Sequence, residues 1–400
     1  MNRNRALLIL YQDVRALFHH RGEHLARYLA SRFTNLDVVS ITKMYDGPGT
    51  DPAWKKAMLG LRDVIFKRVT AIRDGNVVHL IVRFPRLPGV FDYLLRDFWT
   101  YASVRKRLKR HYELCILAHP RLAFVALHLK KLGKIDVLIY DDWDYFPGEF
   151  PHDPFWKSIM GQREIISVRG ADGVVSVSSG LQELRLQQGA KRTMLVPNGV
   201  DYALFRQAQV KRPHPPTLIY MGSLSEMWGV ELPILALPMI RKQMPKVRYL
   251  LLGRGPDEIR LKGLAREMGL EDCVHFCGNQ SYRDLPNFLA EADIGVATSR
   301  DTDFRKYACP LKVVEYMAAG LPVISTRYGQ TKNMVEEAKA GETIDFDPEA
   351  FAGAALSLLS AQSTYKLYAD NAAAFAQTYD WEVLLNRELE FIDHVAYLSR

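Results

Sequence analysis

Cysteine is scarce in this sequence, with four residues among 400. Thiols so few and so scattered exclude a disulfide framework and suit a reducing compartment. Cys273 and Cys277 stand close together, but no second close pair completes the four ligands of a structural zinc site. We therefore expect buried or incidental thiols and no metal ion.

Long apolar runs are also absent. The longest run near the start, residues 6–11, is far shorter than the roughly 20 residues of a membrane span and lacks the apolar core of a signal peptide. No repeat or low-complexity tract appears. The sequence is 48% hydrophobic and 24% charged, as in a soluble globular protein, and at about 150 residues per domain it holds two or three domains. We expect a chain that stays in the cytoplasm.

Acidic residues are few in the first part of the chain. Residues 1–110 contain 21 Lys and Arg against 9 Asp and Glu, a charge of +12, whereas the remainder contains 32 against 36, a charge of −4. A basic region of this kind attracts nucleic acid, an anionic membrane surface or a phosphate-bearing substrate. No nucleic-acid-binding motif accompanies the charge, so we expect no nucleic-acid partner.

Short strand-like segments alternate with helix-length segments in two series, which predicts parallel, doubly wound sheets. The first series consists of residues 7–11, 38–41, 77–82, 115–118, 137–140, 173–177 and 194–196. The second series consists of residues 218–221, 247–252, 274–276, 294–297 and 322–325.

A proline cluster at residues 212–216 lies between the two series and marks a linker, because proline cannot sit inside a helix or a central strand. We expect an α/β chain with two Rossmann-like domains facing a cleft, covering residues 1–205 and 206–380. The helical tail at 381–400 would return to the first domain. The loops after the strands of both sheets would line the cleft and carry the function.

The most informative segment runs from Pro310 to Ile324. It predicts a proline-led helix that ends at Gly320 and is followed by a strand. The free N–H groups in the first turn of such a helix favour a phosphate, and Lys312 adds a full charge. Glu315 stands one turn further, where it could accept hydrogen bonds from a ribose diol. An ordinary capped helix with an exposed Glu315 is the competing interpretation.

This segment resembles the C-terminal signature of GT-B glycosyltransferases of the family-4 type, in which a proline-led helix carries a glutamate before a Met-Ala-x-Gly-x-Pro-Val run. Other segments resemble motifs of the same family in the same order. They are Val196–Asp201, Tyr220–Leu224, Leu251–Pro256, Phe276–Asn279 and Ala292–Ile294. The ordered set covers about residues 170–330 and implies the GT-B architecture.

The resemblance also implies roles for individual residues. Glu315 would hold the ribose of a nucleotide sugar, and Asn279 would lie beside its base. Gly222 would form the glycine loop of the second domain, while Arg254 and Lys312 would face the diphosphate. Two such cations stabilise the charge that develops on a leaving nucleoside diphosphate, which removes the need for a metal. The implied donor is a UDP- or GDP-linked sugar, which is a substrate, and no cofactor is expected.

The chain departs from the family pattern at three donor-side positions. Ser223 and Trp228 stand where the family usually has an arginine and a lysine. Tyr307 stands where the family has its first glutamate, which contacts the donor sugar. Three nearby cations could supply the lost charge or could be ordinary solvated loop residues: Arg300, Arg305 and Lys306.

Two residues of the first domain resemble family positions on the other side of the cleft. Gly22 follows the first strand, as the family's glycine loop does, and would let the diphosphate approach closely. His119 resembles a family histidine near the transferred sugar, where it could donate to a hydroxyl or to developing charge. A loop histidine that holds a backbone carbonyl is the competing interpretation.

Residues 140–146 combine three acids with aromatic side chains at the end of a strand. Aromatic faces bind sugar rings, and carboxylates orient hydroxyls or remove a proton. If transfer inverts the anomeric centre, Asp142 or Asp144 is the candidate base. The resemblance favours retention, in which case these acids bind the acceptor or hold the loop.

Two basic segments of the first domain predict a membrane-facing surface. Residues 55–69 have apolar side chains at helical spacing, with Met58 and Val69 among them, flanked by cations that include Lys55 and Lys56. The second segment sets aromatic side chains directly before a run of cations, and its members include Phe98, Trp99, Arg105, Lys106 and Arg107. Such a pair can lie in a membrane interface. An ordinary packing face with a solvated rim is the competing interpretation.

We predict an enzyme, a glycosyltransferase that moves a sugar from a nucleotide-sugar donor to a lipid-linked or membrane-proximal glycan acceptor. It would act in cell-surface polysaccharide or glycoconjugate synthesis, with retention, while bound peripherally to the anionic inner face of the membrane. The alternatives are an inverting glycosyltransferase, a nucleotide-sugar epimerase of the same fold, and a nucleic-acid binder.

Overall fold

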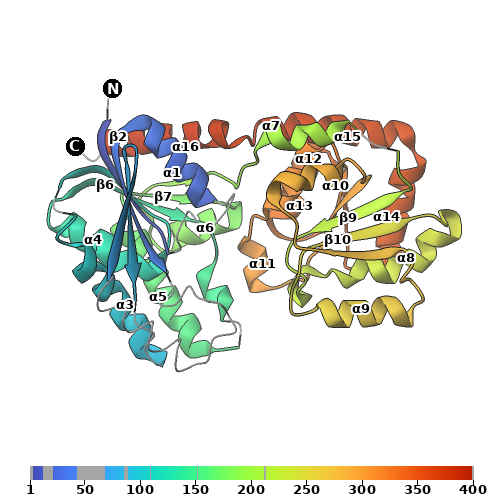
Figure 1. Ribbon diagram of the computed structural model, residues 1–400, viewed down its shortest axis with the longest axis horizontal. Helices are drawn as coiled ribbons and strands as arrows, with labels where there is room; N and C mark the ends of the chain where they lie inside the picture. The colour runs from blue at the N-terminus through green and yellow to red at the C-terminus, as the bar shows by residue number, and fades with distance from the viewer. Residues whose placement is uncertain are drawn as a thin grey trace. The chain divides into compact units, whose positions relative to one another are not determined.

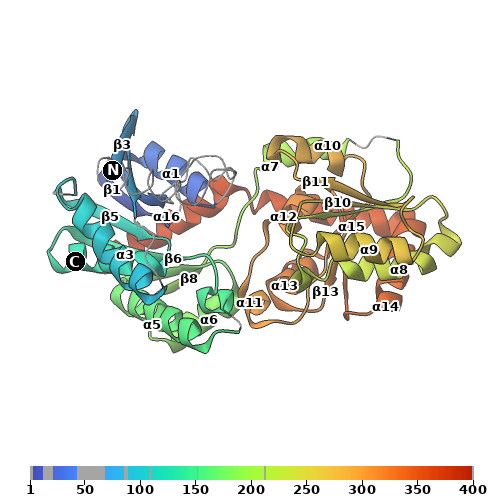
Figure 2. The ribbon, with the colours of Figure 1, turned by 60° about the horizontal axis from the view of Figure 1, so that its bottom comes forward.

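The computed structural model describes residues 3–11, 21–42, 68–84, 89–108, 110–150, 152–210 and 213–398. The chain forms two compact units, each with its own sheet and helices (Figures 1 and 2). Unit 1 comprises Met1–Val196 and Leu385–Arg400, and unit 2 comprises Pro197–Leu384. Both units are α/β, with largely parallel sheets, as the two series of strand-like segments predict.

Unit 1 contains an eight-stranded sheet with the order β3-β4-β2-β1-β5-β6-β7-β8. Its strands are β1 (Arg3–Ile9), β2 (Phe33–Thr42), β3 (Val69–Asp74), β4 (Val77–Arg83), β5 (Tyr112–Leu117), β6 (Ile135–Asp142), β7 (Gly173–Ser176) and β8 (Thr193–Leu195). Neighbouring strands are parallel except β3 and β4, which are antiparallel.

The antiparallel strand β3 corrects one prediction. Val69 was expected to end a basic helix, but it begins β3, which pairs with β4 across the turn at Gly75 and Asn76. Gly75 has a φ of 55°, the left-handed conformation that favours glycine at the first position of this two-residue hairpin loop. Residues 55–67 of the predicted basic helix, including Lys55, Lys56 and Met58, lie outside the described residues.

Helices cover both faces of this sheet. The helical elements of unit 1 are α1 (Arg21–Arg32), α3 (Gly89–Val104), η1 (Pro120–Leu122), α4 (Ala123–Lys131), η2 (Phe146–Glu149), α5 (Pro154–Gly170), α6 (Ser179–Gln187) and the end of α16 (Trp381–Leu398). Figures 1 and 2 show α3, α4 and α5 on one side of the sheet, with α1 and α16 on the other. The Asp97 carboxylate ties the first three together, because it accepts the Phe124 amide of α4 at 2.8 Å and pairs with Arg163 of α5 at 2.6 Å.

Unit 2 contains a six-stranded parallel sheet with the order β11-β10-β9-β12-β13-β14. Its strands are β9 (Thr217–Met221), β10 (Arg248–Leu252), β11 (Val274–Gly278), β12 (Ile294–Ala297), β13 (Val323–Thr326) and β14 (Gly341–Ile344). The first five were predicted from their apolar runs. β14 was not, because this edge strand is only half-buried at three of its four positions and carries no apolar run.

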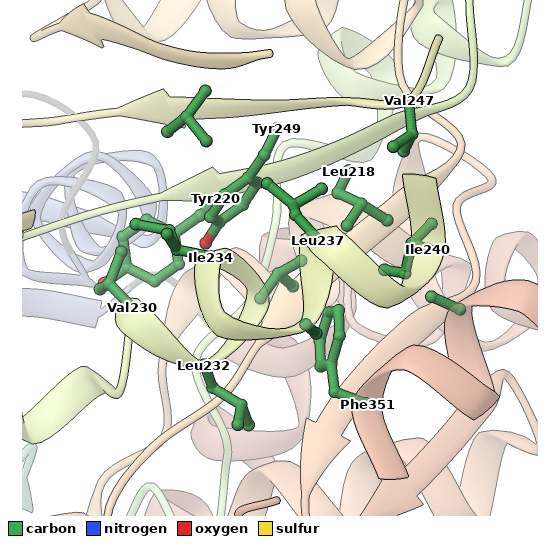
Figure 3. Packing of buried hydrophobic residues seen from close by; sticks show 14 of the residues in the cluster. Leu218, Tyr220, Val230, Leu232, Ile234, Leu237, Ile240, Val247, Tyr249 and Phe351 are labelled. Carbon is green, nitrogen blue, oxygen red and sulfur yellow. The ribbon is translucent and has the colours of Figure 1, made fainter. Parts of the chain in front are cut away.

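The helices of unit 2 surround this sheet. They are α7 (Tyr202–Phe205), η3 (Arg206–Gln209), η4 (Glu226–Trp228), α8 (Glu231–Gln243), α9 (Glu258–Glu267), η5 (Tyr282–Asp284), α10 (Leu285–Leu289), α11 (Asp303–Tyr307), α12 (Leu311–Ala318), α13 (Gly329–Ala338), α14 (Pro348–Ser360), α15 (Gln362–Gln377) and the start of α16. Figure 3 shows Ile234, Leu237 and Ile240 of α8 packed with Tyr249 of β10 and Phe351 of α14. This core fixes the strands whose ends carry the candidate site.

The units divide between Val196 and Pro197, not after residue 205 as expected. The Pro-Asn-Gly-Val-Asp turn belongs to unit 2, because the Asn198 amide donates to the Cys309 carbonyl at 2.8 Å and Val200 pairs with Asp380 in a parallel bridge. The proline cluster near residue 213 therefore precedes β9 within unit 2 and does not link the units.

We predict that Gly199→Ala destabilises unit 2 by about 1–3 kcal/mol, because overpacking a tight contact has this cost. A Cβ at Gly199 would lie 2.8 Å from the Tyr379 carbonyl oxygen and 2.8 Å from the Trp381 ring. Gly263→Ala is the matched control, since nothing lies within 4 Å of its added Cβ in α9. The control should be neutral or stabilise by about 0.4–1 kcal/mol. Denaturant unfolding of both variants measures the difference, and equal stabilities would contradict the assigned contact.

Candidate functional site

Three glycine loops meet at the carboxyl edge of the unit 2 sheet. Gly222 follows β9 and Gly253 follows β10, with φ values of 134° and 141° that favour glycine. The Gly222 amide donates to the Leu252 carbonyl at 2.9 Å, and the Gly253 amide donates to the Gly278 carbonyl at 2.8 Å. A Cβ at Gly253 would lie 1.9 Å from the Gly222 carbonyl oxygen, so only glycine fits. The edge is built from closely packed backbone.

Helix α12 begins at this edge, as the sequence predicts. It runs from Leu311 to Ala318 with Pro310 as its N-cap, and Gly320 follows in the left-handed conformation at a φ of 68°. The hydrogen bond from Asn198 to the Cys309 carbonyl fixes the chain directly before the helix. The first turn of α12 is therefore held in place by Asn198, which belongs to the Val196–Asp201 segment that resembles a family motif.

Lys312 lies in the first turn of α12, with 7% of its surface exposed. Its Nζ atom lies 3.9 Å from the ring centroid of Tyr220 and 4.1 Å from that of Trp228. It also lies beside Gly222, 3.1 Å from where a Cβ would stand. Among the described residues this buried ammonium has no hydrogen-bond partner. Burial and the nearby Arg305 lower the pKa of Lys312 well below its usual range, and Glu315 opposes that shift.

Glu315 is 5% exposed, which rules out the ordinary helix with an exposed glutamate. Burial raises the pKa of Glu315 to about 7, and the hydrogen bond from the Tyr282 hydroxyl and the charge of Lys312 limit the rise. The carboxylate is thus ionised in part near neutral pH. In that form it can accept two hydrogen bonds, as the expected contact with a ribose diol requires.

Arg254 and Asn279 border the same edge of the sheet, next to the glycine residues that follow or end its strands. Both are exposed, and Asn279 directly follows β11. Arg254 lies over Gly278, since a Cβ at that glycine would be 3.5 Å from the Arg254 Nη2 atom. Tyr307 is half-buried at the end of α11. The proposed contacts of these three residues with a donor remain predictions.

The structure separates the three cations that could replace the missing family charges. Lys306 is exposed, which fits a solvated loop residue. Arg300 pairs with the buried Glu231 and lies 4.8 Å from the Phe346 ring centroid. Arg305 is 2% exposed, with its guanidinium carbon 3.7 Å from the ring centroid of Trp228. A solvated loop cation is therefore the wrong interpretation for Arg305.

His119 lies in unit 1 after β5, packed between aromatic rings. Its ring centroid is 4.5 Å from that of Tyr11 and 4.2 Å from that of Phe146. Its Nδ1 atom accepts the Arg121 amide at 3.1 Å, so the side chain caps the short helix η1 that follows it. Burial, with the charges of Arg121 and Arg96, lowers the pKa of His119 well below its usual range. The neutral ring therefore carries its proton on Nε2, which can donate to a sugar hydroxyl.

Gly22 is placed differently from the expected glycine loop. It is buried in the first turn of α1, and a Cβ there would lie 2.7 Å from the Trp143 ring. Close packing of α1 against the loop after β6 accounts for this glycine without a ligand.

Asp142 is buried in an ion pair, which fits the alternative that this acid holds the loop. Arg185 donates to its carboxylate from Nε at 2.7 Å and from Nη2 at 3.0 Å, and both side chains are fully buried. Glu164 accepts from Arg185 at 2.8 Å and from the Phe146 amide at 3.0 Å. The acids and the arginine thus hold the loop that carries Phe146 against His119. Asp144 lies half-buried in the same loop and remains a candidate for acceptor binding.

A second buried ion pair joins α1, β6 and α16 within unit 1. Arg21 donates to Asp141 at 3.0 Å, to Glu388 at 2.6 Å and to the Val196 carbonyl at 3.0 Å. The Trp143 indole donates to the same Asp141 carboxylate at 2.5 Å. Burial and the charge of Asp141 raise the pKa of Glu388 to about 8, and Arg21 opposes the rise. Sequence reasoning missed this cluster because its members are far apart along the chain.

The predicted membrane surface is present only in part among the described residues. Phe98 is 58% exposed and its ring centroid lies 6.2 Å from that of Phe124, which is 39% exposed. The cations of this surface are also exposed: Arg105, Lys106 and Arg107. Trp99 is not available for insertion, because its indole donates to the Arg83 carbonyl at 3.1 Å and its ring lies 3.9 Å from the Arg68 guanidinium carbon.

Within the described ranges, no group of three or more His, Cys, Asp and Glu side chains could hold a metal ion. In that same part of the chain, no helix is both long enough and apolar enough to cross a membrane.

Residues 201–375 match the family model described as "Glycosyl transferases group 1". The chain is 33% identical to the putative colanic acid biosynthesis glycosyltransferase WcaL of Salmonella typhimurium over 36% of this chain and 36% of WcaL, so it matches about a third of that relative. It is 24% identical to the putative teichuronic acid biosynthesis glycosyltransferase TuaH of Bacillus subtilis over 93% of this chain and 92% of TuaH.

Among solved structures, HepE of Anabaena in complex with UDP and glucose matches with a TM-score of 0.71 and 18% identity, covering 97% of this chain and 99% of HepE. At this identity the likeness concerns the fold alone. Together, the matches confirm the predicted α/β fold class and the resemblance to GT-B glycosyltransferases of the family-4 type.

We predict that Asp142→Asn destabilises unit 1 by about 1.5–3 kcal/mol, because an amide cannot accept both of the charge-assisted hydrogen bonds that Arg185 donates to the Asp142 carboxylate. Arg185 would keep only Glu164 as its carboxylate partner among the contacts described here. Asp144→Asn in the same loop is the control and should change stability much less, since that side chain is half-buried. Thermal unfolding measures both. An Asp142→Asn variant with unchanged stability and no transferase activity would restore Asp142 as a catalytic base.

Proposed function

We propose that the protein is a glycosyltransferase that moves a sugar from a UDP- or GDP-linked donor to a lipid-linked or membrane-proximal glycan, with retention. The observation that carries this proposal is the pair of buried ionisable residues, Lys312 and Glu315, in α12 beside the glycine edge of unit 2. A phosphate fits an unpaired ammonium in a first helical turn, and a ribose diol fits a buried carboxylate. Within one helix the two side chains therefore suit the two ends of a nucleoside diphosphate.

The relatives support the substrate class and the biological setting. WcaL and TuaH are named for colanic acid and teichuronic acid biosynthesis, and the HepE structure is titled as a complex with UDP and glucose. These names and this title support a sugar nucleotide as donor and a polysaccharide as product. We extend them to this chain.

Chain residues account for the chemistry of transfer without a metal. Negative charge develops on the diphosphate as the bond to the sugar breaks, and Lys312 stabilises it. His119 donates from Nε2 to a sugar hydroxyl, and Phe146 and Tyr11 hold its ring in place. With Asp142 committed to Arg185, the described residues offer Asp144 alone of the two candidate bases for an inverting reaction, and this favours retention.

The proposal predicts that a nucleotide sugar binds more tightly as pH rises from 6 to about 7.5. Glu315 has a pKa of about 7, so its carboxyl is protonated at pH 6 and must be ionised to accept both ribose hydroxyls. Titration of Lys312 has the opposite sign, because deprotonation weakens its attraction to phosphate. Glu315→Gln should therefore remove the rise, and Glu342→Gln on the β14 edge strand is the control.

Thermal stabilisation by a panel of UDP- and GDP-sugars identifies the donor, since a ligand at 100 times its Kd adds about 2.7 kcal/mol to the folded state. Calorimetry with that donor between pH 6 and 7.5 then measures the slope, and turnover with chelator present tests metal independence. No stabilisation by any panel member would refute the proposed donor class. If donor affinity still rises with pH in Glu315→Gln, the proposed ribose contact of Glu315 is refuted and the rest of the proposal is not.

We further propose that unit 1 binds an anionic membrane surface through the exposed Phe98 and the cations Arg105, Lys106 and Arg107. Each basic residue near an anionic leaflet contributes about 1 kcal/mol, and that attraction is screened over about 8 Å at physiological salt. The inserted Phe98 ring contributes through apolar burial, which salt affects little.

Reversal of the three cations to Glu should lower binding to anionic vesicles by at least about tenfold. Phe98→Ser should also lower vesicle binding, and the size of this loss should be the same at low and at high salt concentration. Ile259→Ser is the matched control, because Ile259 is 85% exposed on α9 of unit 2. Sedimentation with phosphatidylglycerol and phosphatidylcholine vesicles measures all three variants. Equal binding of the wild-type protein to both vesicle types, or to neither, would contradict the membrane proposal.

A further inference from the structure

Trp228 contacts two buried cations at the carboxyl edge of the unit 2 sheet. The Arg305 guanidinium carbon lies 3.7 Å from its ring centroid and the Lys312 Nζ atom lies 4.1 Å from it. Tyr220 adds a second aromatic face, 3.9 Å from Lys312. Cations over aromatic rings are attracted by the ring quadrupole, which allows them to be buried together.

The backbone of Arg305 is held in place at both its amide and its carbonyl group. Its amide donates to the Thr302 hydroxyl that caps α11, and its carbonyl lies against Gly329, 2.7 Å from where a Cβ would stand. Trp228 is fixed too, because its amide donates to Ser225 at 3.0 Å and its carbonyl accepts from Thr298 at 3.2 Å. Both members of the stacked pair, Arg305 and Trp228, therefore have fixed backbone positions at the edge of the sheet.

The electrostatics of this cluster favour an anion. Arg305 and Lys312 lie on the same Trp228 ring, so two cationic side chains stand close together, with Glu315 as the opposing charge on α12. The Lys312 ammonium has no hydrogen-bond partner among the described residues, although Lys312 is only 7% exposed. Two like charges side by side in a buried site are stabilised when a polyvalent anion lies between or beside them.

We propose that Arg305, positioned by Trp228, is the second cation that binds the donor diphosphate, in place of the basic residues that this chain lacks at Ser223 and Trp228. The inference rests on the proposed function. An arginine suits this role because its planar fork can stack on an aromatic ring and still direct its N–H groups to phosphate oxygens. Trp228 is a positioning residue, since it acts on the phosphate through Arg305.

The test compares a nucleoside diphosphate with its nucleoside, using UDP with uridine and GDP with guanosine, by calorimetry on the full chain. Arg305→Gln should weaken diphosphate binding by at least about tenfold, the loss expected for a charge-assisted hydrogen bond. Nucleoside binding should change less than about twofold, since it makes no phosphate contact. Lys306→Gln is the matched control, because it removes a neighbouring cation that is exposed. It should leave both affinities within about twofold.

Two further variants separate a phosphate contact from a structural role. Arg305→Lys keeps the charge without the fork and should recover part of the diphosphate affinity. Trp228→Leu should lower the ratio of diphosphate to nucleoside affinity while leaving nucleoside binding in place. A general loss of structure would lower both affinities together and contradict the inference.

The outcomes also distinguish this inference from the proposed function. If Lys312→Gln loses diphosphate affinity and Arg305→Gln keeps it within about twofold, the donor site stands and the role of Arg305 is refuted. If the wild-type protein binds neither UDP nor GDP, both are refuted.

Discussion

Burying an ionised side chain costs several kcal/mol unless an opposite charge or hydrogen bonds compensate it, and this constraint separates the scaffold of the molecule from its candidate site. In unit 1, Arg185 and Arg21 are both buried, and each bonds to two carboxylates. In unit 2, Lys312 is buried without a hydrogen-bond partner among the described residues. The compensated charges hold elements of unit 1 together, whereas Lys312 is the side chain on which the proposed phosphate contact depends.

The compensated clusters of unit 1 serve the candidate site indirectly. Arg185 binds Asp142 at the end of β6 and Glu164 of α5, and Glu164 accepts the amide of Phe146. The Phe146 ring then packs on His119, whose Nδ1 is already occupied by a backbone amide. The His119 ring is thereby held in place, and the amide on its Nδ1 atom leaves the proton of the neutral ring on Nε2.

The sequence predicted what local patterns encode. Apolar runs located most of the parallel strands, and the proline-led segment located α12 to within a residue at its start. β3 and β14 were missed because one depends on a hairpin turn and the other is a half-buried edge strand. The ion pair that fits the loop-holding alternative for Asp142 was not foreseen, because its partner Arg185 is 43 residues away and long-range pairing of this kind leaves no periodic signal in one sequence.

The departures from the family pattern can be understood through the same constraint. A tryptophan at position 228 removes a cation from one loop but supplies an aromatic face on which another cation, Arg305, is buried from a different loop. In the proposed donor site, the cation beside Lys312 comes from the segment after β12, whereas the basic residues of the family pattern stand after β9. Tyr307 follows Arg305 by two positions on the same short helix. The position where the family pattern has its first glutamate and the cation proposed to bind phosphate therefore belong to one segment, α11. A donor site that keeps its phosphate charge while changing its sugar-side residue would retain the nucleotide class and alter which sugar it accepts.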